Sequence, residues 1–392
     1  MRTTSRKSER FTESVIRGMT RLCEQHGGIN LAQGFPDFPT PAALKEAAKQ
    51  AIDDDYNQYA VTWGTRALRQ AVADKMARYN GVHCDPETEV TITCGSTEAM
   101  IAALLAVVNP GDEVVIFEPF YENYGPDAVI SGAAPVYVAL RPPHFTFDVA
   151  ELRAACSANT KAIIVNTPHN PSGHVFAPAE LEQISALCHE FDCLAITDEI
   201  YEHILYDGRT HVSLASLPGM RERTITISGL SKTYSVTGWR LAYAVANAKL
   251  SAAIRKMHDF LTVGAPHPLQ CAAVHAFQLP GDYYRQLAAD YSARRALLSA
   301  ALSAAGFRIF MPEGAYYILA DIGPFGFSDD TGFCDWLLRQ AGVAAVPGSS
   351  FYRHPELGHR LVRFAFCKRE DTLREAARRL ARVPELVKTA RS

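Results

Sequence analysis

Short runs of consecutive apolar residues, separated by helical stretches, dominate the chain between about residues 90 and 246. A strand that is apolar throughout, instead of alternating with polar residues, is typical of a parallel sheet covered by helices on both faces. The stretches "TEAMIAALLAVV" and "PAELEQISALCHEF" supply plausible covering helices. We therefore predict an α/β architecture with a mostly parallel sheet, in which the last run is antiparallel because no crossover helix precedes it. The runs are VTIT (90–93), VVIF (114–117), AIIVN (162–166), LAIT (194–197), TITIS (224–228) and LAYAVA (241–246).

The pattern changes after about residue 284. A long helical segment, "YYRQLAADYSARRALLSAALSAAG", precedes "FRIFMPEGAYYILADI", which we interpret as strand, turn and strand. A helix, a strand near "LVRFAF" and a final helix follow. This predicts a smaller α+β domain that the N-terminal segment completes. We expect a large domain over residues 46–284 and a small one made of residues 1–45 and 285–392, which suits a chain of 392 residues.

Composition excludes several classes of protein. A formal net charge of −3 does not fit a nucleic-acid or anionic-membrane surface. The charged first residues lack the apolar core of a signal peptide, and no apolar run reaches transmembrane length. The nine cysteines form no CxxC pair, which indicates reduced thiols used as small apolar residues. We expect a cytoplasmic protein.

Polar side chains follow four of the strands, where ligands bind in open α/β sheets. After VTIT, "CGSTEA" contains a glycine, Ser96 and Thr97 and opens a helix. Its free N–H groups and the helix dipole favour a phosphate, although the plainer alternative is that Ser96 only caps the helix. After AIIVN, Asn170 lies between two prolines in "TPHNPSG", where it either forms a turn or holds its amide at a fixed angle.

After LAIT, Asp198 is expected at a buried strand end, where a carboxylate needs a cation, a metal or a protonated ring nitrogen. Tyr201 follows three residues later and projects to the same side if the chain turns helical. A metal is the alternative because Glu199, Glu202 and His203 are close by, but these residues show no recognised ligand spacing.

Lys232 follows the fifth strand, in "ISGLSKTYSVTGWR". The groups of pyridoxal 5′-phosphate match the residues at these four strand ends, which are a phosphate-binding helix N-terminus, an amide, an acid with a phenol, and a lysine. A lysine forms its Schiff base, an acid partners its ring nitrogen, and hydroxyl or amide groups bind its phenolic oxygen.

The chain resembles the fold-type I pyridoxal-phosphate-dependent aminotransferases of class I/II, in particular the kynurenine/glutamine and methionine/aromatic aminotransferase branch. The resemblance runs from "NLAQGFPDFPTP" to "LVRFAFCKRE", nearly the whole chain. It implies a large domain with a seven-stranded sheet, a smaller α+β domain and a homodimer with sites at its interface. The motifs that carry it are "YNQYAVTWGTRALRQA", "CGSTEAM", "FEPFYENY", "NTPHNPSG", "TDEIYEHI", "SKTYSVTGWR" and "RFAF".

The resemblance also implies a role for each matching residue. Lys232 forms the Schiff base and then moves the proton as general acid and base. Asp198 pairs with the pyridine nitrogen, while Asn170 and Tyr201 bind the phenolic oxygen. Arg363 grips the substrate α-carboxylate, and the backbone at Gly34 closes over the substrate. The remaining cofactor-binding residues are Tyr121, which stacks on the ring, and Ser96, Thr97, Ser231, Arg240 and the neighbouring subunit's equivalent of Tyr59, which are placed around the phosphate.

Some of these assignments have structural alternatives. Tyr121 could be core packing, and Arg363 could form a surface ion pair. Many relatives carry a phosphate-binding serine three residues before the lysine, where this chain has Gly229. Ser228 and Ser231 are the candidates to replace that serine.

The expected reaction is transamination between an amino acid and a 2-oxo acid. The loop "LTVGAPHPLQ" lacks the arginine found in dicarboxylate-specific relatives. We therefore expect uncharged or aromatic substrates of the methionine, glutamine, phenylalanine or kynurenine type. The alternatives are a C–S lyase, an amino-acid tailoring or cyclopropane-forming enzyme, and a cofactor-binding regulator, which the absence of a basic helix-turn-helix segment disfavours. The residues expected around the substrate side chain are Phe35, Phe38, Trp63, Tyr121 and Tyr352.

Overall fold

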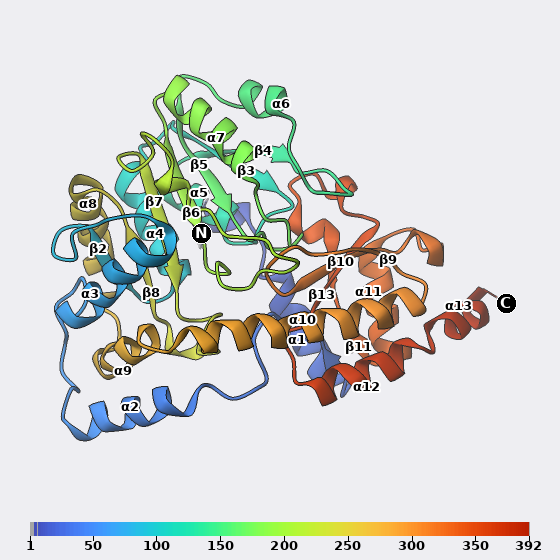
Figure 1. Ribbon diagram of the computed structural model, residues 1–392. Coiled ribbons are helices and arrows are strands. Elements are labelled where there is room, and N and C mark those ends of the chain that lie inside the picture. Colours follow the sequence, from blue (N-terminus) through green and yellow to red (C-terminus); the bar gives the residue numbers. More distant parts are fainter. Residues whose placement is uncertain (1–3, 6, 392) are drawn as a thin grey trace.

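A seven-stranded sheet forms the centre of the computed structural model, which describes residues 4, 5 and 7–391 (Figure 1). Its strand order is β2-β8-β7-β6-β5-β3-β4. Every neighbouring pair is parallel except the two pairs that β8 makes with β2 and β7. The prediction of a mostly parallel seven-stranded sheet with an antiparallel last strand is therefore confirmed. The strands are β2 (Val90–Thr93), β3 (Glu113–Glu118), β4 (Ala134–Ala139), β5 (Thr160–Asn166), β6 (Leu194–Asp198), β7 (Thr224–Gly229) and β8 (Ala242–Val245).

The sequence runs located six of these strands and missed β4. This strand lies at the edge of the sheet, pairs only with β3 and is mostly half-buried or exposed. It also contains Pro135, which an edge strand tolerates because it needs no hydrogen bond from that nitrogen. The continuous burial that marks the other strands is therefore absent from β4.

Helices cover both faces of the sheet, as Figure 1 shows. Ile116 and Ile164 pack with α4 and α8 in one apolar cluster, whereas their neighbours Val115 and Ile163 pack with α7 in another. Successive residues of a strand point to opposite faces, so a strand covered on both sides must be apolar throughout. The helices that accompany this sheet are α2 (Ala42–Asp53), α3 (Arg66–Lys75), α4 (Ser96–Val107), α5 (Tyr124–Ser131), α6 (Val149–Ala154), α7 (Pro178–Glu190), α8 (Ala248–Thr262) and α9 (His267–Phe277).

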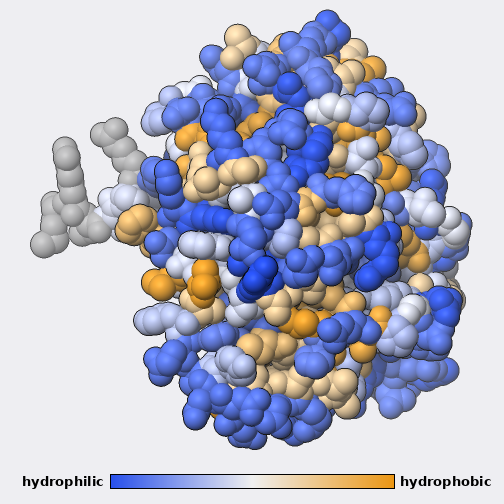
Figure 2. Space-filling model, turned by 60° about the vertical axis from the view of Figure 1, so that its left-hand side comes forward, coloured by the Kyte–Doolittle hydropathy of each residue, from blue (hydrophilic) through white to orange (hydrophobic). Residues whose placement is uncertain are grey.

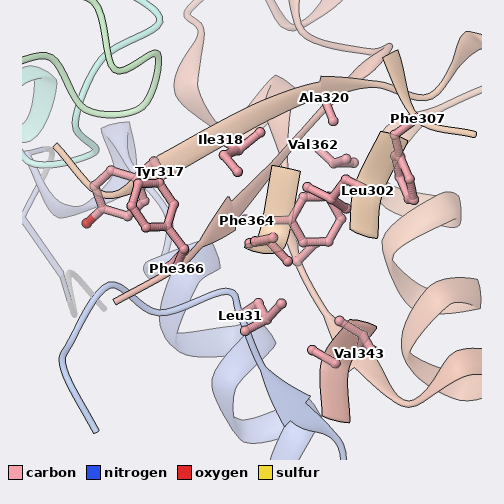
Figure 3. Close-up of a cluster of buried hydrophobic side chains, with 14 of the residues drawn as sticks. Leu31, Leu302, Phe307, Tyr317, Ile318, Ala320, Val343, Val362, Phe364 and Phe366 are labelled. Atoms are coloured by element: carbon pink, nitrogen blue, oxygen red, sulfur yellow. The ribbon is translucent and has the colours of Figure 1, made fainter. Parts of the chain in front are cut away.

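A second, four-stranded antiparallel sheet lies to the right in Figure 1, with the order β12-β13-β10-β9. Its core packs Ile318, Val362 and Phe364 against Leu302 and Phe307 (Figure 3). The long helix α10 joins the two halves, because its first turns pack beside the large sheet while its later leucines enter this core. The elements are α10 (Gly281–Ala304), β9 (Arg308–Phe310), β10 (Tyr317–Asp321), α11 (Asp330–Ala341), β12 (Val346–Pro347), β13 (Leu361–Ala365), α12 (Glu370–Leu380) and α13 (Val383–Arg391).

The N-terminal segment packs beside this second sheet. Strand β1 (Ile29–Asn30) pairs in parallel with β11 (Val343–Ala344), and helix α1 (Val15–Gln25) lies against both. Among the described residues, none of the helices combines the length and apolar character needed to span a bilayer.

Candidate active site

A cavity of about 330 Å³ opens at the carboxyl ends of the central strands. Asn166 and Asp198 end β5 and β6, and Lys232 follows β7. The cavity thus brings together eleven residues that the sequence placed in the site, from segments far apart along the chain. These are Gly34, Ser96, Thr97, Tyr121, Asn170, Asp198, Tyr201, Ser231, Lys232, Arg240 and Arg363.

The start of α4 forms one wall of this cavity. Gly95 is the N-cap residue, with φ of 91° and no side-chain capping bond, so the alternative that Ser96 caps the helix is wrong. A Cβ at Gly95 would lie 2.3 Å from Nη2 of Arg240, so only glycine lets the guanidinium approach the helix N-terminus. Backbone N–H groups, two hydroxyls and an arginine therefore meet where an anion is favoured.

Asp198 lies deep in the cavity with neutral hydrogen-bond donors only. Its carboxylate accepts bonds from the hydroxyl of Tyr124 at 2.8 Å and from the backbone N–H of Ile200 at 3.2 Å. Burial raises the pKa of Asp198 to about 6, and these two donors only partly offset it. A cationic partner would therefore stabilise the ionised form of this carboxylate. Tyr124 ends the "FEPFYENY" motif three residues after Tyr121 and was not among the site residues predicted from the sequence.

Lys232 projects into the same cavity. Its Nζ lies 3.4 Å from the carbonyl oxygen of Gly34 and about 6 Å from the rings of Tyr201 and Tyr316. Burial lowers the pKa of Lys232 to about 8, so a large fraction of the amine is neutral near pH 8. A neutral buried lysine amine is both a nucleophile and a proton acceptor.

Arg363 is the buried cation of the opposite wall, at 1% exposure. It donates from Nη1 to Oδ1 of Asn170 at 2.9 Å and from Nη2 to the carbonyl of Ala32 at 2.7 Å. Its Nε has no hydrogen-bond partner among the described residues. The alternative of a surface ion pair is therefore wrong, and one donor of the guanidinium remains available to a ligand.

Tyr201 and Gly34 both lie against Tyr317, a second site residue that was not predicted from the sequence. The hydroxyls of Tyr201 and Tyr317 are 3.0 Å apart. A Cβ at Gly34 would lie 2.1 Å from the Tyr317 hydroxyl oxygen, so this backbone position requires glycine. Tyr317 is the first residue of β10 in the second sheet and does not follow the carboxyl end of a strand, which is why no strand-end motif indicated it.

Several predicted residues lie elsewhere. Tyr59 is outside the cavity and 84% exposed. Of the two candidate serines, Ser231 lines the cavity, whereas the Ser228 hydroxyl donates to Glu202 on the far side of the strand. A side chain at Gly229 would meet Ala242 at 2.7 Å, so no serine fits there without a shift.

The expected side-chain pocket is only partly correct. Phe35 and Tyr121 line the cavity, and Tyr352 lines a neighbouring one. Phe38 instead packs on Tyr291, and Trp63 lies beneath a guanidinium at the surface. Helix α1 adds residues that the sequence analysis did not anticipate, because no motif marked its approach to the site: Ile16 and Arg17.

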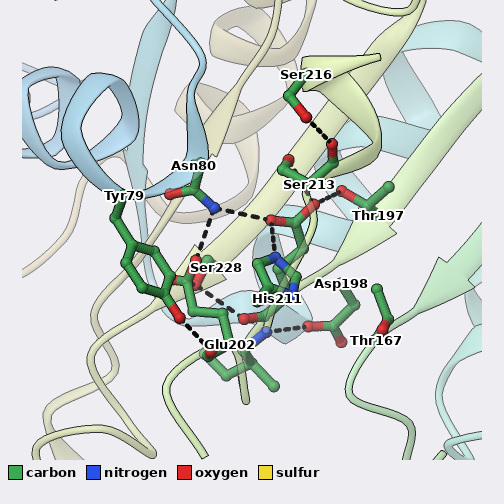
Figure 4. Close-up of polar contacts among 12 residues, drawn as sticks. Tyr79, Asn80, Thr167, Thr197, Asp198, Glu202, His211, Ser213, Ser216 and Ser228 are labelled. Atoms are coloured by element: carbon green, nitrogen blue, oxygen red, sulfur yellow. Dashed lines mark hydrogen bonds and ion pairs between the residues drawn. The ribbon is translucent and has the colours of Figure 1, made fainter. Parts of the chain in front are cut away.

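A buried polar network lies behind the cavity (Figure 4). Glu199, Glu202 and His211 could each offer one metal ligand, and their ligating atoms lie within 4.8 Å of one another. However, the ammonium of Lys75 contacts Glu202 at 2.5 Å and supplies the cation. The His203 of the metal alternative is not part of this set and packs at a tilt against Tyr79 and Tyr284. Nδ1 of His211 has no hydrogen-bond partner among the described residues.

The cavity residues fit pyridoxal 5′-phosphate. The anion seat at α4 suits its phosphate, the cation-seeking carboxylate of Asp198 suits its pyridinium nitrogen, and the amine of Lys232 suits its aldehyde. Fold and site together define an α/β enzyme that uses pyridoxal 5′-phosphate.

The chain belongs to the aminotransferase class I and II family, whose model matches residues 26–380. It is 40% identical over 367 residues to the methionine aminotransferase of Escherichia coli K12, covering 94% of this chain and 95% of that protein. It is 35% identical over 386 residues to human kynurenine–oxoglutarate transaminase 1, covering 90% and 92%. The solved N-succinyldiaminopimelate aminotransferase of Mycobacterium tuberculosis superposes with a TM-score of 0.95 at 40% identity, covering 97% of this chain and all of that one. The protein is an amino acid aminotransferase, and its cofactor is pyridoxal 5′-phosphate.

Proposed function

We propose that this aminotransferase acts on uncharged and aromatic amino acids of the methionine, glutamine, phenylalanine or kynurenine type, in a ping-pong reaction with a 2-oxo acid. The observation that carries the proposal is the composition of the cavity wall, which combines a buried guanidinium with aromatic side chains. Arg363 offers a buried guanidinium beside the aromatic side chains Phe35, Tyr121 and Tyr317. Similarity to a methionine aminotransferase and a kynurenine transaminase supports it.

The residues of this chain then divide the work. The bound cofactor supplies an electron sink that stabilises negative charge at the substrate α-carbon. Arg363 and Asn170 hold the α-carboxylate and so orient the Cα–H bond. Asp198 would keep the cofactor nitrogen protonated, and Tyr201 would donate to the phenolic oxygen. Lys232, with its lowered pKa, takes the α-proton and returns it as general acid and base.

The cavity residues that would hold the phosphate are Ser96 and Thr97 at the start of α4, Ser231 and Arg240. The backbone of Gly34 covers the substrate, since its carbonyl already accepts from Lys232 and from the Tyr316 hydroxyl.

The chain functions as a cytoplasmic homodimer in this proposal, with Tyr59 reaching the partner's phosphate. An exposed apolar surface supports the dimer. Tyr59 and Phe260 are 84% and 93% exposed, and their segments meet where Nε2 of His258 lies 2.9 Å from the carbonyl oxygen of Thr62. Figure 2 brings this side of the molecule forward and shows apolar surface among hydrophilic side chains. Exposed apolar patches of this kind mark interfaces.

The same proposal divides the chain into a cofactor-binding domain, residues 46–284, and a small domain, residues 1–45 and 285–392. The pairing of β1 with β11 supports the inclusion of the N-terminal segment in the small domain.

The test is a single-turnover experiment on the cofactor-loaded enzyme. With methionine, phenylalanine or kynurenine and no acceptor, we expect one 2-oxo acid per site and no free ammonia. Release of ammonia with pyruvate from a cysteine conjugate, in place of that stoichiometry, would favour the C–S lyase. Borohydride reduction followed by peptide mass spectrometry is expected to fix the cofactor on Lys232. Full turnover by Lys232→Ala would contradict its assigned role.

A further inference from the structure

A second cavity, of about 590 Å³, adjoins the active site. We call it the outer chamber and define it by Phe11, Thr12, Phe120, Tyr137, Tyr352 and Arg353. Arg17 and Glu122 line both this chamber and the cofactor cavity, so the two spaces meet at these side chains.

Ser14 holds this boundary in place. Its hydroxyl accepts from the backbone N–H of Arg17 at 3.2 Å, as the N-cap of α1, and donates to the carboxylate of Glu122 at 2.5 Å. Helix α1 is thereby tied to the loop that carries Tyr121, the residue expected to stack on the cofactor. The boundary is therefore a fixed feature of the site and not a loose surface contact.

The inner wall of the chamber is aromatic. The rings of Phe120 and Tyr137 lie 5.4 Å apart, and Phe120 and Tyr352 are both buried. Such a wall favours an apolar or aromatic chain that passes along it.

The open charge of the chamber is positive. Within the described part of the chain, neither Arg17 nor Arg353 forms an ion pair. Two carboxylates of the chamber already have other hydrogen-bond donors. Glu13 accepts two hydrogen bonds from Arg21, and Glu122 accepts one from the Ser14 hydroxyl. A carboxylate entering the chamber would thus meet two guanidinium groups that are free to bind it.

We propose that the amino acid side chain extends between Arg17 and Glu122 into the outer chamber, and that the enzyme also accepts amino acids with a long side chain ending in a carboxylate. The side chain packs along Phe120 and Tyr352, and its terminal carboxylate pairs with Arg17 and Arg353. This substrate class rests on the proposed transamination at Lys232 and extends the range of that same site.

The test compares 2-aminosuberate with 2-aminooctanoate, which has the same length but no terminal carboxylate, and uses methionine as the short reference. We expect kcat/KM to be higher for 2-aminosuberate by about tenfold or more, because charge-assisted hydrogen bonds are the strong ones. In Arg17→Gln this advantage is expected to disappear through a higher KM. The matched control is Arg339→Gln on α11, because Arg339 pairs with Asp335 and lines neither cavity; its ratio should equal that of the wild type.

A second variant tests whether the substrate side chain occupies the outer chamber, independently of its charge. Thr12→Trp places a large ring in the chamber from an exposed position, so it should lower kcat/KM for both eight-carbon substrates relative to methionine. Spectral titration of the cofactor with 2-aminosuberate gives the affinity independently of turnover.

Equal affinity of the wild type for both eight-carbon compounds would overturn the proposal, and so would an equal loss for all substrates in Arg17→Gln. Failure to transaminate methionine would instead count against the proposed function, because the chamber is judged from the ratio between the two long compounds.

Discussion

The buried ion pair between Lys75 and Glu202 offers a sharp test of how the site is supported. The two side chains are 4% and 3% exposed, and the ammonium lies 2.5 Å from Oε1 of Glu202. Asn80 and Ser228 donate to the same carboxylate at 2.9 Å and 2.7 Å (Figure 4). Burial alone would raise the pKa of Glu202, but the charge and hydrogen bond of Lys75, together with His203 and His211, outweigh it and hold this pKa well below the usual range.

Replacing Lys75→Met leaves the carboxylate buried without its cation. Breaking a buried pair by removing one partner costs about 3–5 kcal/mol of unfolding free energy. Glu202→Gln added to that variant should recover most of the loss, because the neutral amide still accepts from Asn80 or Ser228 without an unpaired charge. In the single variant Glu202 loses the partner that depresses its pKa, so the deficit should shrink as the pH falls and the carboxyl protonates.

Urea unfolding of the apoenzyme at pH 8 and pH 5, for both variants and the wild type, measures these quantities. Lys49→Met is the control, because the pair it makes with Glu46 has both side chains more than two-thirds exposed and should show no measurable change. A loss of less than about 1 kcal/mol of unfolding free energy in Lys75→Met would refute this role of the ion pair, and so would a double variant as unstable as the single one.

Two further predictions concern the site and the dimer. Because burial raises the folded-state pKa of Asp198 to about 6, from an unfolded value of about 3.9, its ionisation costs the apoenzyme about 3 kcal/mol above pH 6 and nothing below about pH 4. Asp198→Asn should therefore stabilise the apoenzyme against urea at pH 8 but not at pH 4, and an equal effect at both pH values would count against it. Phe260→Asp should convert the proposed dimer to a monomer in sedimentation experiments, whereas Val149→Asp, an exposed apolar residue on α6, should not; an unchanged dimer in Phe260→Asp would exclude this surface as the interface.

Much of the fold could be predicted because fully covered strands are apolar throughout. That pattern located six strands of the large sheet and failed only at β4, the edge strand that is largely uncovered. The core site residues followed from the same logic. Carboxyl ends of parallel strands meet at one edge, so Asp198, Asn170 and Lys232 had to approach one another.

Contacts that depend on the packing of distant elements could not be predicted. Tyr317 reaches Tyr201 from a strand more than a hundred residues later, and no local pattern marks that approach. The choice between Ser228 and Ser231 was open in the sequence, because it depends on which side of the chain faces the cavity.

The sequence by itself determined the α/β architecture and the cofactor, and it predicted the lysine that binds this cofactor, because strand periodicity and strand-end chemistry are local properties of the chain. Only the tertiary structure decided the surroundings of that site. It placed Lys75 against Glu202, 127 positions away, and it placed Arg17 of α1 at the boundary of two cavities. Burial then set the ionisation of Asp198 and Lys232, because desolvation depends on the whole fold and not on neighbouring residues.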